Sequence, residues 1–303
     1  MSADQTPAPP ATPAPALPCF SYHGGKTRLA PVIASLIGPH RTYVEPFAGS
    51  LAVFLAKAPS PTEIINDLDT GIVTFYRVLR TRPDELVRAC SLTPYARGEY
   101  EACRLDDPEL DELERARRWW VRTNYSIGKH SWSIRGSGFA AAPDTGGASN
   151  ARKTVTHVGR MHAIAARLRT AIIEHRPALE VLAKYATAPD VAVYADPPYL
   201  GSTRSLDRRR RTRDYSHDMP AAADHAALLE VLLASPAAVI LSGYHSDLYD
   251  SALTDWWMLE VTVDKPSANG RRAQMAKATE VIWSNRPPPG QLRLDLSDEE
   301  ASP

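Results

Sequence analysis

Short, mostly apolar runs recur along this 303-residue chain, separated by stretches whose apolar residues are spaced three or four positions apart. The run Val191–Ala195 is typical, because successive apolar residues bounded by turn signals indicate a buried strand. Comparable runs predict six more strands, which begin near Thr42, Glu63, Ala171, Ala237, Trp256 and Glu280. Helical spacing fills several of the intervals, at Leu51–Ala58, Asp84–Cys90, Leu110–Arg122, Pro177–Ala186 and Ala221–Ala234. The alternation predicts an α/β fold on a seven-stranded sheet.

The alternation is interrupted between residues 82 and 166, where helical stretches lead into the Gly/Ser-rich segment Ile127–Asn150. We therefore expect one α/β domain in two parts, residues 19–81 and 167–285, with a mostly helical recognition insert at residues 82–166 between them. Residues 1–18 are rich in proline and alanine and predict a disordered arm, and residues 286–303 predict a tail.

Composition narrows the class of protein only modestly. The 35 basic and 35 acidic side chains cancel, so a nucleic-acid partner must be sought in local clusters of charge. Three cysteines without a CxxC pair suit a reducing compartment, and we expect a cytoplasmic protein. No apolar run reaches the roughly 20 residues of a membrane span. The nine histidines lack metal-ligand spacing, so no metal is expected.

The sequence Asp196-Pro197-Pro198-Tyr199 directly follows the strand Val191–Ala195. Pro197 keeps Asp196 out of the helical region, and neither proline has an N–H for a sheet hydrogen bond. A rigid corner with a carboxylate, a carbonyl and an aromatic ring then lies at the carboxyl end of a strand, where open α/β sheets bind ligands. The alternative is a plain proline turn.

Two glycine-containing turns near the N-terminus are candidate parts of a ligand pocket. Tyr22-His-Gly24-Gly25-Lys26 predicts a flexible bend, although it also fits a loop with a solvated lysine. The stretch Glu45-Pro46-Phe47-Ala-Gly49 predicts a strand turning into a helix. Asp67 ends the next apolar run, at the position where an acid holds a ribose, and its alternative role is a helix N-cap, which Asp69 fits equally.

Basic and aromatic residues cluster in two places. In the insert, Arg122, Lys129, Trp132 and Arg135 suit phosphate and base contacts, and a solvated helix face is the alternative. Arg208-Arg209-Arg210-Arg211 follows the Asp196 corner and predicts either a phosphate clamp or a solvated run.

Taken in order, the motifs YHGGK, VEPFAG, IINDLD, VYADPPY, SGYHSDLYDSAL and TEVIWSN resemble those of the Dam family of adenine-N6 DNA methyltransferases. The resemblance runs from about Phe20 to Asn285. It implies a Rossmann-like methyltransferase sheet, S-adenosylmethionine as cofactor and double-stranded DNA as partner. It further implies a monomer in a bacterial or phage setting, in some cases paired with a restriction endonuclease.

The resemblance also implies roles for individual residues. Asp196, Pro197, Pro198 and Tyr199 would act on a flipped-out adenine, with Asp196 between base and cofactor. Residues bordering the cofactor would be Tyr22, Gly24, Gly25, Lys26, Glu45, Pro46, Phe47, Gly49 and Asp67, with Asp67 holding the ribose.

The chain departs from the family pattern at Ser50-Leu51, at Tyr22 and after Arg135-Gly136, where an asparagine-rich continuation is missing. Two different functions would fit the same motifs. One is a non-catalytic DNA-binding decoy, and the second is an amino methyltransferase acting on cytosine-N4, RNA or a protein glutamine.

Overall fold

A computed structural model describes residues 16–22, 24–105, 107–127, 138–141, 147–200, 219, 221–265 and 276–288. Its strands are β1 (Thr42–Glu45), β2 (Thr62–Asn66), β3 (Ile172–Glu174), β4 (Val191–Ala195), β5 (Ala238–Gly243), β6 (Trp257–Lys265) and β7 (Ala276–Ser284). Its helices are α1 (Ala30–Leu36), α2 (Ala52–Ala56), α3 (Thr70–Thr81), α4 (Pro83–Ser91), α5 (Arg97–Ala102), α6 (Glu112–Tyr125), α7 (Gly147–Leu168), α8 (Ala178–Tyr185), α9 (Ala222–Ala234) and α10 (Asp247–Ala252).

The strands form one seven-stranded sheet in the order β3-β2-β1-β4-β5-β7-β6. The first five strands of this order are parallel, and β7 pairs antiparallel with both β5 and β6. All seven predicted strands and the predicted α/β class are therefore confirmed. The chain leaves β1 toward β2 on one side and returns as β4 on the other, which makes the carboxyl ends of β1 and β4 a topological switch point.

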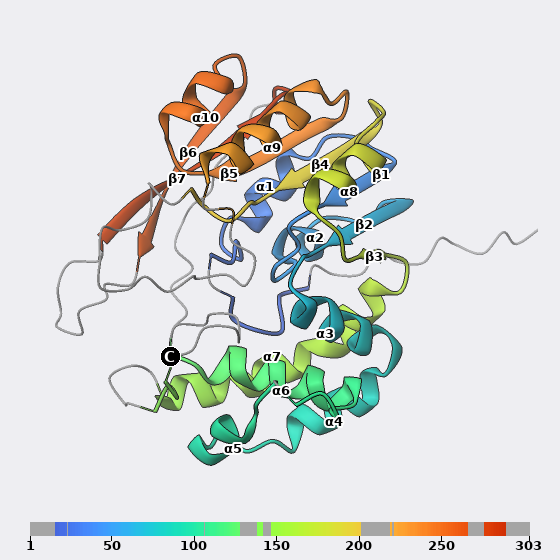
Figure 1. Cartoon of the computed structure of the whole chain (residues 1–303), viewed down its shortest axis with the longest axis vertical. Coiled ribbons are helices and arrows are strands. Elements are labelled where there is room, and N and C mark those ends of the chain that lie inside the picture. Colours follow the sequence, from blue (N-terminus) through green and yellow to red (C-terminus); the bar gives the residue numbers. More distant parts are fainter. Residues whose placement is uncertain are drawn as a thin grey trace, which may run out of the picture.

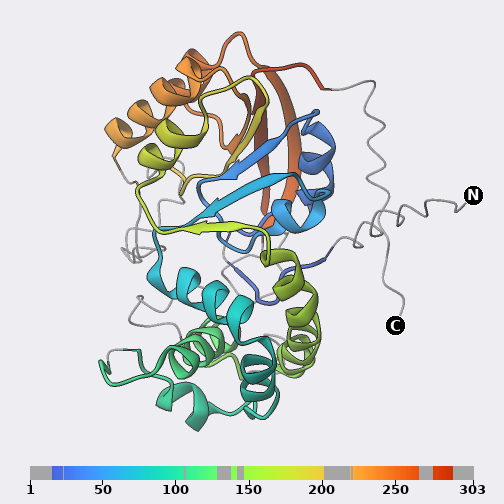
Figure 2. The same cartoon turned by 90° about the vertical axis from the view of Figure 1, so that its right-hand side faces the viewer.

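Helices cover both faces of the sheet. Figure 2 shows α8, α9 and α10 on one side and α1 and α2 on the other. Alternation along the strands supplies a core to each face, as in β1, where Tyr43 packs with one cluster and Val44 with the other. Because both faces are buried, β4 is apolar along its whole length, which explains the uninterrupted pattern in the sequence.

Helices α3 to α7 form a helical layer beyond β3 (Figure 1). Its core is aromatic, since Trp119 and Trp120 of α6 are buried and the Trp119 ring lies 5.3 Å from that of Phe75 in α3. The helix α7 was not predicted. Its buried positions include Thr154 and His157, so polar residues interrupt the apolar stripe that would have marked it in the sequence.

The segment Ala16–Tyr22 lies against the helical layer. Three side chains of that layer bind its backbone: Trp120 Nε1 donates to Cys19 O at 2.8 Å, Arg160 donates to Pro18 O at 3.0 Å, and Asn124 Oδ1 accepts from Ser21 N–H at 3.3 Å. This N-terminal strap is thereby fixed just before the glycine bend at residues 24 and 25.

A buried ion cluster joins the layer to the sheet. The Glu63 carboxylate of β2 accepts from Arg167 at the end of α7 and from Lys57 Nζ at 2.6 Å. The Arg167 guanidinium also lies over the Phe54 ring, 3.9 Å from its centroid. All three charged side chains are buried, so each depends on the others for compensation of its lost hydration.

Removing one member should therefore be costly. We expect Arg167→Ala to lower the free energy of unfolding by about 3–5 kcal/mol, because Glu63 loses the stronger of its two cationic partners. The exposed Arg169 two residues on provides the matched control, and Arg169→Ala should stay within about 0.5 kcal/mol of the unmodified protein. Urea denaturation of the three proteins measures both values. A loss below about 1 kcal/mol in Arg167→Ala would contradict the burial of this cluster.

Candidate active site

A cavity of about 420 Å³ opens at the carboxyl ends of β1, β2 and β4. This volume lies within the range of small-molecule sites. Every residue predicted to border a cofactor, and every residue of the predicted catalytic corner, lines it: Tyr22, Gly24, Gly25, Lys26, Glu45, Pro46, Phe47, Gly49, Asp67, Asp196, Pro197, Pro198 and Tyr199. The fold thus brings together residues drawn from four separate stretches of the sequence.

The turn after β1 is tight and held by Asp67. Gly49 has a φ of 45° and Leu51 a φ of 60°, so two left-handed residues within three positions turn the chain from strand to helix. Asp67 Oδ2 accepts from the Gly49 N–H at 2.8 Å, and its Oδ1 accepts from the Asp69 N–H at 2.9 Å. The two bonds fix the carboxylate at the cavity wall.

Asp69, not Asp67, caps helix α3, because its Oδ1 accepts from the Gly71 N–H at 2.7 Å. Asp67 is therefore not needed for capping. Burial raises the pKa of Asp67 to about 7, with a further rise from the neighbouring Asp69 carboxylate. A partly buried carboxyl with so high a pKa favours ligands that bring hydrogen-bond donors or positive charge.

Glu45 adds a second such carboxyl at the end of β1. Its Oε2 accepts from the Tyr43 hydroxyl at 2.7 Å, and burial raises its pKa to about 8. A cation entering the cavity would lower both pKa values and ionise both groups. The cavity is accordingly suited to a positively charged ligand.

The Asp196 carboxylate is held from two sides. Its Oδ2 lies 2.9 Å from Lys26 Nζ, and its Oδ1 accepts from the Ser242 hydroxyl at 2.8 Å. Ser242 is in turn 3.0 Å from the hydroxyl of Tyr194, and both residues are buried. These contacts fix the direction in which the carboxylate presents its remaining lone pairs.

Lys26 is the centre of the polar contacts. Besides Asp196, its Nζ donates to Tyr199 OH at 2.5 Å and to Gly24 O at 3.0 Å. Burial alone lowers the pKa of Lys26, but the nearby Asp196, Tyr194 and Glu280 outweigh it and hold the pKa above its usual range. The loop allows this approach because Gly24 has a φ of 73° and a Cβ on Gly25 would lie only 3.0 Å from Tyr22 O.

Three contributors to the site were not predicted: Tyr194, Ser242 and Glu280. Ser242 had a usable signal, since it lies near the carboxyl end of an apolar strand beside Asp196. Tyr194 has the pattern of an ordinary core residue of β4. Glu280 lies on β7, and only the insertion of that strand between β5 and β6 brings it near the cavity.

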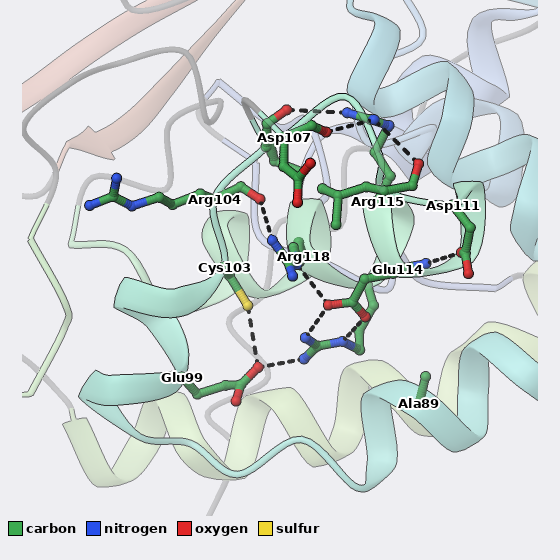
Figure 3. Close-up of polar contacts among 12 residues, drawn as sticks. Ala89, Glu99, Cys103, Arg104, Asp107, Asp111, Glu114, Arg115 and Arg118 are labelled. Atoms are coloured by element: carbon green, nitrogen blue, oxygen red, sulfur yellow. Dashed lines mark hydrogen bonds and ion pairs between the residues drawn. The ribbon is translucent and has the colours of Figure 1, made fainter.

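The arginines of α6 are engaged within the helical layer (Figure 3). Arg118 donates to Glu114 at 2.7 Å and to Arg104 O at 3.0 Å, and Arg115 binds three backbone carbonyls. Arg122 lies over the Tyr100 ring at 4.2 Å and donates to Tyr100 O at 3.3 Å. The DNA contact of Arg122 stays a prediction, and its intramolecular contacts would have to coexist with it.

The remaining DNA-contact candidates, Lys129, Trp132, Arg135 and Arg208–Arg211, lie outside the described residues. The two ends of segment 128–137 are nevertheless defined, because Ser126 and Phe139 form an antiparallel bridge. Phe139 packs on Tyr95, with ring centroids 5.1 Å apart. The residues on either side of segment 128–137 therefore lie next to each other, and the packing of Phe139 on Tyr95 attaches them to the helical layer.

Within the described ranges, no group of three or more His, Cys, Asp or Glu side chains is arranged to hold a metal. Among the described helices, none combines the length and apolar character needed to cross a membrane.

Comparison with known proteins places these features in a family. No curated protein matches the sequence. Among solved structures, similarity is found to yhhF from Escherichia coli, provisionally described as a methyltransferase, with 10% identity over 85% of this chain and 80% of that one. The TM-score of 0.31 is too low to carry weight. The model of the D12 class N6 adenine-specific DNA methyltransferases, in contrast, matches residues 22–261, from the glycine bend to β6. The chain therefore belongs to the D12 class of N6 adenine-specific DNA methyltransferases.

Proposed function

We propose that this enzyme methylates the N6 amine of an adenine flipped out of duplex DNA, with S-adenosylmethionine as the methyl donor. The observation that carries the proposal is the Asp196 carboxylate, fixed on both oxygens and facing a cavity lined by every predicted cofactor residue.

The size of the cavity and the acidic side chains that line it support S-adenosylmethionine as its ligand. We propose that Asp67 binds the ribose hydroxyls, because its carboxylate is fixed at the cavity wall by two backbone N–H groups. Glu45 and Asp67 have raised pKa values that a cationic ligand would lower, and S-adenosylmethionine is such a cation. When bound, it supplies a methyl group already activated on a sulfonium.

The residues of the corner are suited to activating an exocyclic amine. The lone pair of the adenine N6 is delocalised into the ring, so the amine is a poor nucleophile. An ionised carboxylate offers about four acceptor sites. Lys26 and Ser242 occupy two on Asp196, which leaves others for the N6 hydrogens. Together with the Pro197 carbonyl, Asp196 would favour a pyramidal nitrogen whose lone pair points toward the methyl group.

Duplex DNA hides the amine, so the base must leave the helix, and Tyr199 offers a ring on which it can stack. We propose that residues 82–166 recognise the target, with Lys129, Trp132 and Arg135 among the residues that contact the DNA. Arg208–Arg211 would contact the phosphates near the extruded nucleotide.

Transfer of a labelled methyl group to duplexes that contain or lack adenine tests the proposed function directly. A non-catalytic decoy would bind DNA without transferring label. Incorporation into cytosine, RNA or a protein would instead identify an amino methyltransferase with a different substrate. Sequencing that detects modified bases, applied to a methylation-free host expressing this chain, would give the target sequence.

Asp196→Ala should reduce methyl transfer more than tenfold, which corresponds to at least about 1.4 kcal/mol of barrier. Duplex binding should survive, because phosphate contacts supply most of the affinity. The matched control is Asp190→Ala, which removes an exposed carboxylate just before β4. Single-turnover rates and binding isotherms of the two variants measure the difference. A rate above one tenth of the unmodified enzyme's would argue against a role for Asp196 at the amine.

Asp67→Ala should weaken S-adenosylmethionine binding about ten- to a hundredfold, the effect of losing charge-assisted hydrogen bonds worth roughly 1.5–3 kcal/mol. DNA affinity should be unchanged. Calorimetric titration of this variant beside Asp190→Ala measures the effect. An unchanged cofactor affinity would show that Asp67 does not bind the ribose and only stabilises the turn at Gly49.

Cofactor affinity should also rise with pH. The pKa of Asp67 is about 7 in the free protein, and binding favours its ionised form. Protonation therefore competes with binding below the pKa and ceases to compete above it. From Asp67 alone, affinity should increase about tenfold between about pH 6 and pH 8. Asp67→Asn should remove this tenfold contribution and leave only the part of the dependence that comes from Glu45. A profile equally steep in Asp67→Asn would assign the titration to another group.

A further inference from the structure

Glu280 is a buried carboxylate next to three apolar core residues of β7. Its neighbours Val281, Ile282 and Trp283 are all buried in the clusters on the two faces of the sheet. Glu280 itself is only 8% exposed. Since an apolar residue would pack here without the cost of dehydrating a charge, packing alone does not account for a glutamate at this position.

The contacts of Glu280 all lead to the active site. Its Oε1 accepts from Tyr199 OH at 3.1 Å, lies 3.5 Å from Tyr244 OH and lies 3.9 Å from Lys26 Nζ. The three partners come from the corner after β4, the end of β5 and the glycine bend. Glu280 is therefore the residue through which β7 contacts all three of these segments.

Through these contacts the Tyr199 ring is fixed in orientation. Its hydroxyl accepts from Lys26 Nζ at 2.5 Å while donating to Glu280, so both of its strong hydrogen-bonding directions are engaged. The ring also packs against Tyr244, with centroids 4.5 Å apart at an interplanar angle of 56°. A phenol held at its hydroxyl and against one neighbouring ring has little freedom to rotate or tilt.

Glu280 also affects how the Lys26 charge is distributed. Lys26 Nζ lies 2.9 Å from Asp196 and 3.9 Å from Glu280, so one ammonium serves two carboxylates. Without Glu280, the ammonium would be paired with Asp196 alone. A fully paired Asp196 is a weaker acceptor for the hydrogens of an amine.

We infer that Glu280 is a positioning residue for methyl transfer, which sets the Tyr199 ring for the flipped adenine and limits the hold of Lys26 on Asp196. The inference rests on the proposed function, because it assigns Tyr199 and Asp196 their roles at the base. Glu280 acts through these residues, so its loss should affect the rate of methyl transfer and leave cofactor and DNA affinities in place.

A double-mutant cycle tests the inference with Glu280→Ala, Tyr199→Phe and the combined variant. Single-turnover rates are measured with cofactor and duplex saturating, and dissociation constants by titration. Glu280→Ala should lower the rate about ten- to a hundredfold with both dissociation constants within about threefold of the unmodified enzyme's. Tyr199→Phe removes the hydroxyl that Glu280 binds. The loss of rate in the combined variant should therefore be much smaller than the product of the losses in the two single variants.

The matched control is Glu260→Gln, which removes an exposed carboxylate on the adjacent strand β6 and should stay within about twofold of the unmodified rate. Glu280→Gln keeps an amide oxygen as acceptor but no charge, and should fall about three- to tenfold, which provides a readout if Glu280→Ala does not fold.

Three outcomes would overturn the inference: an unmodified rate in Glu280→Ala, an unmodified rate in Glu280→Gln, or losses that multiply in the combined variant. If the unmodified chain methylates adenine, any of these outcomes overturns only the role of Glu280 and leaves the proposed function in place. An unmodified chain that transfers no methyl group to adenine would overturn the proposed function, and this inference with it.

Discussion

The candidate active site depends on one buried ammonium group, that of Lys26. Lys26 Nζ contacts Asp196, Tyr199 and Gly24, which come from the corner after β4 and from the glycine bend, and it lies near Glu280 of β7. Both carboxylates lie within 4 Å of this one ammonium, whose positive charge offsets the repulsion between them. Lysine suits the position, since a compact charge with three donors can serve partners in several directions.

This arrangement contrasts with the ion cluster around Glu63. There Glu63, Lys57 and Arg167 are all buried and satisfy one another away from the cavity, so the cluster stabilises the contact between the sheet and α7. Asp196, by contrast, lines the cavity and has acceptor sites beyond the two that Lys26 and Ser242 use. Buried ion pairs therefore stabilise the fold where they are closed to ligands, and in the proposed mechanism they serve methyl transfer where they are open to the cavity.

The sequence predicts the part of the site that the strand order determines. Apolar runs identify the parallel strands, and Glu45, Asp67 and Asp196 then meet because the ends of such strands share one edge. Glu280 could not be placed in this way, since its position depends on a long-range antiparallel pairing. For a related reason, the sequence does not show that Glu114 already binds Arg118 and that backbone carbonyls already bind Arg115.

The N-terminal strap has a mechanical consequence. Its backbone is bound at Pro18, Cys19 and Ser21 by side chains of α6 and α7, and only a short length of chain separates those contacts from Lys26. These three hydrogen bonds make the backbone of the strap follow any movement of α6 and α7. Only a few residues separate the helices of the proposed recognition insert from the ammonium beside Asp196, so a shift of α6 would move the anchored end of the segment that carries Lys26.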